Sequence, residues 1–195
     1  MASDTRNRLV RTTARLLRKQ GYGATGLNQV MAEAEAPKGS MYFHFPGGKE
    51  ELAAAAVDYF AERVMRHMEK GLAEAGTVGE AVATFFDEYI EHFHRTDFTE
   101  GCAVATVVLD AAAAHEALAA ATGRALRGWI DRFAEALEAE GRSPAEAHRL
   151  ATVIVAAIEG TVVIGKGERT TEPVVAVQAV LRDLLAPADA LASAN

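Results

Sequence analysis

Apolar residues recur at helical spacing along almost the whole chain, with polar residues on the opposite faces. No run alternates apolar and polar side chains as a half-buried strand would, and no segment repeats. The pattern predicts an all-α fold of about nine helices. The expected helices cover residues 4–20, 25–34, 38–44, 48–73, 78–95, 102–112, 115–140, 144–164 and 173–185, with a loop over 165–171.

Two helix starts are marked by a hydroxyl residue followed three positions later by glutamate. Thr77 precedes Glu80 in this way, and Ser143 precedes Glu146. In such capping boxes the side chains of both residues bond the backbone amides that a helix start leaves without partners. Pro144 adds a proline at the first helical position, where its missing amide hydrogen costs nothing.

Two short helices stand close together near the N-terminus. Thr25 is placed to cap the first helix, whose apolar positions have helical spacing. A turn at 35–36 separates it from a second helix over 38–44, with Pro37 where helices start well. Two short helices across a tight turn are typical of a helix-turn-helix, whose second helix can enter the major groove of DNA.

The second of these helices carries groups that suit a nucleic acid. Lys38 supplies a cation, and the hydroxyls of Ser40 and Tyr42 can donate to phosphates or base edges. Gly39 has no side chain, so the backbone there can come close to a phosphate. The residues expected nearest to base edges are Lys38, Ser40 and Met41, with Asn28 or Gln29 from the preceding helix.

Charge is distributed unevenly along the chain. The net charge is −7, yet residues 1–50 carry +4 and the remaining 145 residues carry −11. A basic segment on an acidic body favours binding of a polyanion by that segment alone. The arginines of residues 4–20 either form a solvated face or, in the case of Arg6 and Arg8, touch phosphates beside the site.

Composition narrows the class of protein further. Half of the 195 residues are hydrophobic, which is enough for a sizeable core. Cys102 is the single cysteine, so no disulfide can form within the chain. No apolar run approaches the about 18 residues of a membrane span, and no apolar signal segment begins the chain. We expect a cytoplasmic protein that does not contact a membrane.

Aromatic side chains form stripes on two helices of the body. Phe85, Tyr89 and Phe93 share one side of residues 78–95 with His92 at its edge, and Trp129 lies on the stripe of residues 115–140. Such a stripe is core packing or the wall of a ligand pocket, and the spacing alone does not decide between them. Cys102 is expected to be a small buried side chain.

The last two helices are the expected dimer contact. Residues 144–164 have almost no polar side between His148 and Glu159, and a helix apolar all round must be covered all round. A second subunit would supply part of that cover, and residues 173–185 offer another apolar face. The candidate interface residues are Leu150, Ile154, Ile158, Val177 and Leu181.

Residues 21–52 resemble the DNA-binding head of TetR-type transcriptional regulators. The match is specific over Lys-Gly-Ser-Met-Tyr-Phe-His-Phe (38–45) and Gly-Gly-Lys-Glu (47–50). Residues 101–110 look like the motif of the LmrA/YxaF branch of that family. Many members have glycine at the turn between the two helices, where this chain has Glu35. If the backbone there is left-handed, Glu35 costs about 1 kcal/mol and places a carboxylate near DNA.

The resemblance implies a homodimeric repressor that leaves its operator when a hydrophobic or aromatic effector binds the body. It implies phosphate contacts at Tyr42 and Lys49 and a dimer built from the last two helices. The implied regions are a head (1–47), a body (48–186) and a flexible tail (187–195). The candidate DNA-binding residues are Thr25, Asn28, Gln29, Lys38, Gly39, Ser40, Met41, Tyr42, His44 and Lys49. The candidate effector-binding residues are Phe85, Tyr89, His92, Phe93, Cys102, Thr122 and Trp129.

Two other classes of protein remain as alternatives. An all-α enzyme lacks support, because no catalytic constellation stands out and no pair of histidines has the spacing of zinc ligands. His92 and His94, for example, point apart on a helix. We therefore expect no catalytic residue, no metal and no cofactor. A ligand-binding or adaptor protein whose head does not bind DNA is the second alternative, because of Glu35.

Overall fold

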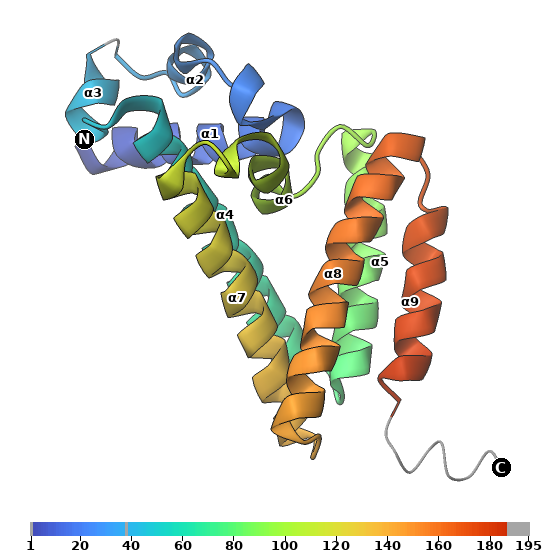
Figure 1. Cartoon of the computed structure of the whole chain (residues 1–195). Coiled ribbons are helices and arrows are strands. Elements are labelled where there is room, and N and C mark those ends of the chain that lie inside the picture. Colours follow the sequence, from blue (N-terminus) through green and yellow to red (C-terminus); the bar gives the residue numbers. More distant parts are fainter. Residues whose placement is uncertain (1, 38, 187–195) are drawn as a thin grey trace, which may run out of the picture. The chain divides into compact units, whose positions relative to one another are not determined.

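The computed structural model describes residues 2–37 and 39–186, which contain nine α-helices, one π-helical turn and no β-strand (Figure 1). The predicted all-α fold is confirmed. The elements are α1 (Ala2–Ala24), α2 (Leu27–Glu33), α3 (Ser40–His44), α4 (Gly48–Glu74), α5 (Val78–Thr96), α6 (Ala103–Val107), η1 (Val108–Ala112), α7 (Glu116–Ala139), α8 (Pro144–Glu168) and α9 (Glu172–Leu184). Lys38 and the predicted tail at 187–195 lie outside the described residues.

Both predicted capping boxes start helices. The side chain of Thr77 accepts a hydrogen bond from the Glu80 amide at 3.2 Å. The side chain of Ser143 accepts one from the Glu146 amide at 3.4 Å, with Pro144 in the first turn of α8. These local signals depend only on neighbours in the sequence, so the positions of α5 and α8 could be predicted from them.

Three expected boundaries are corrected. Helix α3 begins at Ser40 rather than 38, because the Pro37 carbonyl accepts both the Ser40 amide and its hydroxyl in a turn. The expected loop after 164 is helical as far as Glu168, and Arg169 ends α8 with φ 55°. The expected helix over 102–112 is split, since a π-helical turn follows α6 at Val108–Ala112.

The chain divides into two compact units. The first unit comprises Met1–Val64 and Glu100–Arg127, and the second comprises Met65–Thr99 and Gly128–Asn195. Helices α4 and α7 each run through both units. The head and body that the sequence predicts describe a division of function, and that division stays a prediction.

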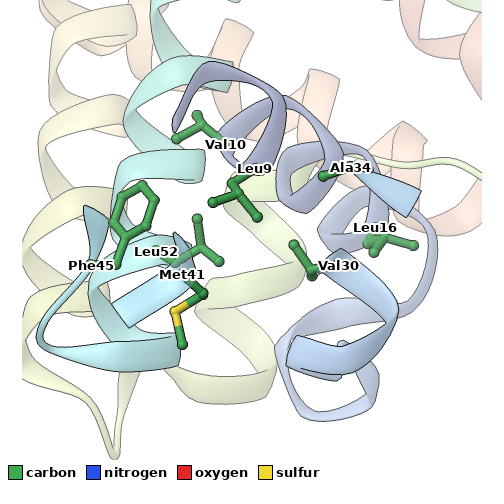
Figure 2. Packing of buried hydrophobic residues seen from close by; sticks show 8 residues of the cluster. All are labelled: Leu9, Val10, Leu16, Val30, Ala34, Met41, Phe45 and Leu52. Carbon is green, nitrogen blue, oxygen red and sulfur yellow. The ribbon is translucent and has the colours of Figure 1, made fainter. Parts of the chain in front are cut away.

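The first unit has a core where α1, α2, α3 and the start of α4 meet (Figure 2). Its fully or almost fully buried residues are Leu9, Val10, Leu16, Val30, Ala34, Met41, Phe45 and Leu52. Gly21 breaks the helical backbone of α1 with φ 78° and ψ 180°, close to the expected end of the first helix. The break turns residues 22–24 away from the line of α1, which brings them next to α4.

The second unit packs α5, α8 and α9 side by side (Figure 1). Phe93 of α5, Ile154 of α8 and Val174 of α9 are all completely buried. Gly165 lies so close to α5 that a Cβ there would meet Phe93 at 2.9 Å and the Thr170 carbonyl at 3.0 Å. Only glycine allows this close approach of α8 to Phe93.

Helix α8 is apolar on both its inner and its outer sides. Ala147, Ala151 and Ile154 are completely buried, whereas Val153 and Ile164 are about half exposed. Of the described helices, α8 is long and apolar enough to cross a membrane, with a mean hydropathy of 1.6 over 18 residues. The core helix of a water-soluble protein meets the same criterion, and the inner side of α8 packs in this way.

Candidate nucleic-acid interface

Helix α3 separates its side chains into a buried and an exposed set. Met41 and Phe45 are completely buried in the core of the first unit. Tyr42 is 63% exposed and Phe43 is 76% exposed. The two exposed rings form an apolar patch of the kind that often serves as an interaction surface. The sequence prediction missed Phe43, although its place between Tyr42 and His44 was the available signal.

Two predicted DNA contacts are buried instead. Met41 is 0% exposed, so its side chain anchors α3 and does not reach a base edge from this structure. Thr25 does not cap α2, whose N-cap is Gly26 without a side-chain bond. The Thr25 hydroxyl donates to the Gly21 carbonyl at 2.6 Å, and its amide donates to the Tyr22 carbonyl at 3.2 Å. Neither donor of Thr25 is left for a phosphate.

Helix α2 offers one open polar side chain and one that is held. Asn28 is exposed, as a contact with DNA requires. Gln29 accepts a hydrogen bond from Gln20 at 2.9 Å and donates to Glu33 at 2.8 Å. Glu33 also pairs with Arg15. The hydrogen bond from Gln29, followed by that from Arg15, holds the pKa of the Glu33 carboxyl below its usual range.

The turn between α2 and α3 has the left-handed backbone that the resemblance suggested. Glu35 has φ 49°, a conformation that costs a residue with a Cβ about 1–2 kcal/mol. Arg8 braces this turn, because its Nε donates to the Ala34 carbonyl at 2.9 Å. Arg6 lies with its guanidinium 5.1 Å from the centre of the Phe45 ring. Arg8 therefore serves the turn itself, rather than the phosphate contact considered from the sequence.

Lys49 lies in the first turn of α4 within a partly buried cradle. Its Nζ is 4.2 Å from the centre of the Tyr22 ring and 3.4 Å from the Gly23 carbonyl oxygen. Burial lowers the pKa of Lys49 from its ordinary value, and the negative charge of Asp110 opposes that change. The cation stands at a helix N-terminus, which is itself a favourable place for a phosphate group.

The open groups of this surface come from α2, α3 and the start of α4. Gly39 is exposed, and a Cβ there would meet no atom within 4 Å, so the fold itself does not require glycine. Ser40 and His44 are partly exposed on α3. Hydroxyls, an imidazole, two aromatic rings and the Lys49 cation can together contact phosphates, sugars and the methyl groups of thymine.

Three of the predicted effector residues line a groove of about 370 Å³ in the second unit. They are Phe85, Tyr89 and His92, and the sequence prediction missed the other residues of this groove. The Phe85 and Tyr89 rings are stacked at 6.3 Å, and His92 lies 5.5 Å from Tyr89. The additional lining residues are His67, Glu88, Glu91 and Arg95, with His67 and Glu88 forming an ion pair.

Four other predicted effector residues are buried. Phe93 is 0% and Trp129 is 4% exposed, so both belong to the packing of the second unit. Thr122, in the first unit, donates its hydroxyl to the Leu118 carbonyl at 2.8 Å. Cys102 is buried, as expected for a small apolar side chain, and precedes α6. The structure thus gives these four side chains packing partners within the chain.

The predicted dimer residues also divide. Ile154 and Leu181 are buried within one chain, so they cannot form the surface that a second chain would cover. Leu150, Ile158 and Val177 are partly exposed. The predicted interface residues do not include the most exposed apolar residues of α8 and α9. These are Val153, Val163, Ile164, Val175, Val180 and Leu184.

Within residues 2–37 and 39–186, no three side chains of histidine, cysteine, aspartate or glutamate stand close enough to hold a metal ion.

Residues 9–56 match the family described as bacterial regulatory proteins, tetR family, and residues 78–180 match the LmrA/YxaF-like C-terminal domain of transcriptional regulators. Over 182 residues the chain is 32% identical to the HTH-type transcriptional regulator LmrA of Bacillus subtilis, covering 93% of this chain and 97% of LmrA.

Two further comparisons agree with this assignment. The HTH-type transcriptional repressor NemR of Escherichia coli is 26% identical over 136 residues, 69% of this chain and 68% of NemR. The crystal structure of reduced E. coli NemR has a TM-score of 0.84 at 23% identity and covers 94% of this chain and 98% of that one. The chain therefore belongs to the TetR family of transcriptional regulators, in its LmrA/YxaF-like branch, and is not an enzyme.

Proposed function

We propose that this protein is a cytoplasmic, homodimeric repressor that a small hydrophobic or aromatic effector releases from a roughly palindromic operator. The observation that carries the DNA-binding part is the exposed outer side of α3, where Tyr42 and Phe43 project from a helix anchored by Met41. A helix anchored on one side and open on the other suits insertion into a major groove. The relatives LmrA and NemR, a regulator and a repressor by name, support the same reading.

In this proposal the groups around α3 have separate tasks. Tyr42 and Lys49 contact phosphates, which sets the position of the protein on the duplex. Asn28 and Ser40 reach base edges, and Phe43 packs against thymine methyl groups or sugars. The left-handed backbone at Glu35 is the geometry expected for the turn of a helix-turn-helix, which supports a DNA-binding head.

DNA binding is tested by fluorescence anisotropy with a duplex from the region upstream of the protein's own gene. Lys49→Ala should weaken binding to all sequences alike and reduce the salt slope by about 1, because one phosphate contact is lost. Lys70→Ala is the matched control, since Lys70 is an exposed lysine of the same helix in the second unit. No binding by the unaltered chain at low salt would support the alternative of an adaptor protein.

The dimer is proposed to form through the outer sides of α8 and α9. Val153, Ile164, Val175 and Val180 are between 45% and 64% exposed in the single chain, which is costly for so many branched apolar side chains. A second copy covering them would place two α3 helices in successive major grooves, about 34–36 Å apart. Sedimentation as a monomer at micromolar concentration would contradict the proposal.

The effector is proposed to bind the groove lined by Phe85, Tyr89 and His92. Aromatic walls with a few polar groups are typical of sites for small organic molecules. Titration with planar aromatic compounds should change the fluorescence of Trp129, and Phe85→Ala should abolish that change. Coupling of about 1–3 kcal/mol would weaken operator binding about 5- to 150-fold, and operator DNA must weaken effector binding equally. Binding that DNA leaves unchanged would rule out release by the effector.

A further inference from the structure

The cradle of Lys49 is formed by a turn that no regular helix holds in place. Gly21, with φ 78°, breaks α1, and the next two residues supply the Tyr22 ring and the Gly23 carbonyl that face the Lys49 cation. The position of Lys49 therefore depends on whatever fixes this turn. Thr25 bonds the Gly21 and Tyr22 carbonyls locally, whereas the Gly23 amide is held by a partner from a distant part of the sequence, within the same unit.

Asp110 of the π-helical turn η1 fixes it. Its Oδ2 accepts a hydrogen bond from the Gly23 amide at 2.6 Å. A Cβ on Gly21 would lie 3.0 Å from this oxygen, and a Cβ on Gly23 would lie 3.4 Å from Oδ1. The carboxylate thus sits directly against two glycines, and its negative charge acts on the Lys49 cation. Single π-helical turns occur often at functional positions.

The neighbour of Lys49 is tied to the same stretch of chain. The Nδ1 atom of His115 lies 3.0 Å from Oε2 of Glu50, and the Ala117 amide donates to Oε1 at 3.4 Å. The His115 ring also meets the Tyr22 ring edge-on at 5.0 Å. The first turn of α4 and the Tyr22–Gly23 turn are therefore both held by residues 110–117.

We propose that Asp110 is a positioning residue for DNA binding, which holds the Tyr22–Gly23 turn so that Lys49 is ready for a phosphate. This inference rests on the proposed function, in which Lys49 contacts the DNA backbone. It extends the DNA-binding surface to the η1–α7 segment, outside the helix-turn-helix.

A held lysine binds a phosphate at lower cost than a mobile one. A long lysine side chain loses rotamer freedom on making a contact, and a cradle removes that loss before DNA arrives. The ammonium group has three donors, and the Gly23 carbonyl occupies one, so two remain for phosphate oxygens. The charged and titratable groups around Lys49 are Tyr22, Glu50, Asp110 and His115, and of these Asp110 favours the charged lysine.

The direction in which removal of Asp110 changes the DNA affinity separates this role from simple electrostatics. Asp110 is a negative charge beside a surface that meets a polyanion, so its removal should strengthen DNA binding if charge alone mattered. If Asp110 positions Lys49, its removal should weaken binding instead. Glu116→Gln is the matched control, because Glu116 is an exposed carboxylate in the first turn of α7, six positions after Asp110.

The test uses the full chain and a mixed-sequence 30-base-pair duplex at low salt, since a phosphate contact needs no operator. Asp110→Ala should raise the dissociation constant about 2- to 12-fold, the cost of immobilising one long side chain. Asp110→Asn keeps an oxygen acceptor for the Gly23 amide, so it should weaken binding less. In a Lys49→Ala background, Asp110→Ala should no longer weaken binding.

Each outcome bears on one proposal or the other. If Asp110→Ala and Asp110→Asn bind as tightly as Glu116→Gln while Lys49→Ala binds weakly, the inference is wrong and the phosphate contact stands. If Lys49→Ala does not weaken binding, the phosphate contact itself is wrong. Should Asp110→Ala fail to fold by circular dichroism, the comparison of Asp110→Asn in both backgrounds decides: equal effects with and without Lys49 would overturn the inference.

Discussion

Distant segments of the chain are joined by different kinds of contact within the first unit and within the second unit. In the first unit, two polar links join residues 100–117 to α1, beside the buried apolar side chains of α6: Arg18 donates to the Gly101 carbonyl at 2.9 Å, and Asp110 accepts from the Gly23 amide at 2.6 Å. In the second unit, α5 and α8 meet through buried apolar side chains, with Phe93 against the backbone at Gly165. The first kind of contact can be exchanged for another polar partner at modest cost, whereas the second kind cannot.

This difference suits a regulator. Polar links can be broken and remade by a small shift of η1. Close apolar packing of α5, α8 and α9 gives a rigid support, because voids and overlaps in a core are both costly. Substitutions should therefore change the free energy of folding by large amounts in the second unit and by small amounts in the first.

The largest difference between the effects of two substitutions is expected at two neighbouring residues of α8. Ile154 is 0% exposed and Val153 is 45% exposed. Ile154→Glu would bury an unpaired charge and should cost at least about 3 kcal/mol of folding free energy, so the chain should lose its helical circular dichroism at 37 °C. Val153→Glu should keep the helical signal and sediment as a monomer. Loss of the helical signal in both variants would show that the outer side of α8 also belongs to the core of one chain.

Gly165 should be intolerant of even one methyl group. Gly165→Ala places a Cβ 2.9 Å from the Phe93 ring and 3.0 Å from the Thr170 carbonyl, so it should destabilise the chain by about 1–3 kcal/mol. Gly167→Ala, in the same helix with no atom within 4 Å of its Cβ, should instead stabilise it by about 0.5–1 kcal/mol. Urea unfolding measures whether each variant gains or loses free energy of unfolding. If both variants gain stability, α5 and α8 can move apart.

In the first unit, glycine is expected to improve the turn at Glu35. Because Glu35 has φ 49°, Glu35→Gly should relieve the left-handed backbone and stabilise the chain by about 0.5–1 kcal/mol. Ala32→Gly, at an exposed helical position three residues earlier, should cost about 0.5–1 kcal/mol. Thermal unfolding distinguishes them. A lower melting temperature for Glu35→Gly would show that its side chain contributes more than its backbone costs.

The smallest effect concerns the exposed carboxylate of Glu33. Hydrogen bonds from Gln29 and Arg15 lower its pKa in the folded chain below the ordinary value of 4.5. The folded state thus binds this proton less readily than the unfolded state, so the stabilisation is present above pH 4.5 and is lost as the pH falls through the lowered pKa. Glu33→Gln should lower the melting temperature slightly at pH 7 and leave it unchanged near pH 3. A difference that persists at pH 3 would assign the effect to packing.

Features that depend on near neighbours could be predicted from the sequence. The caps at Thr77 and Ser143 follow from residues a few positions apart, whereas the left-handed turn at Glu35 was suggested by the family resemblance. The burial of Met41 could not be foreseen, because a helix of five residues has too few positions to show a period. An all-apolar helix likewise does not reveal which side faces inward, which is why Ile154 was assigned to an interface.

Contacts between distant residues account for the other differences. The close approach of α8 to Phe93 takes place at Gly165, and nothing near Gly165 in the sequence indicates that neighbour. The candidate effector groove includes His67 from α4, which no stripe on α5 could predict. Phe43 was missed because a large aromatic side chain is expected to be buried, whereas the Phe43 ring is exposed in the structure.

The polar links of the first unit also set an order of events during synthesis. Gly23 and Asp110 are separated by 87 positions, so a ribosome adding about 5–20 residues per second needs about 4–17 s to make the second after the first. During that interval the Tyr22–Gly23 turn lacks its carboxylate partner, and α2 and α3 are complete in sequence well before the interval ends. A nascent chain therefore gains its full set of head contacts only after η1 and the start of α7 have emerged.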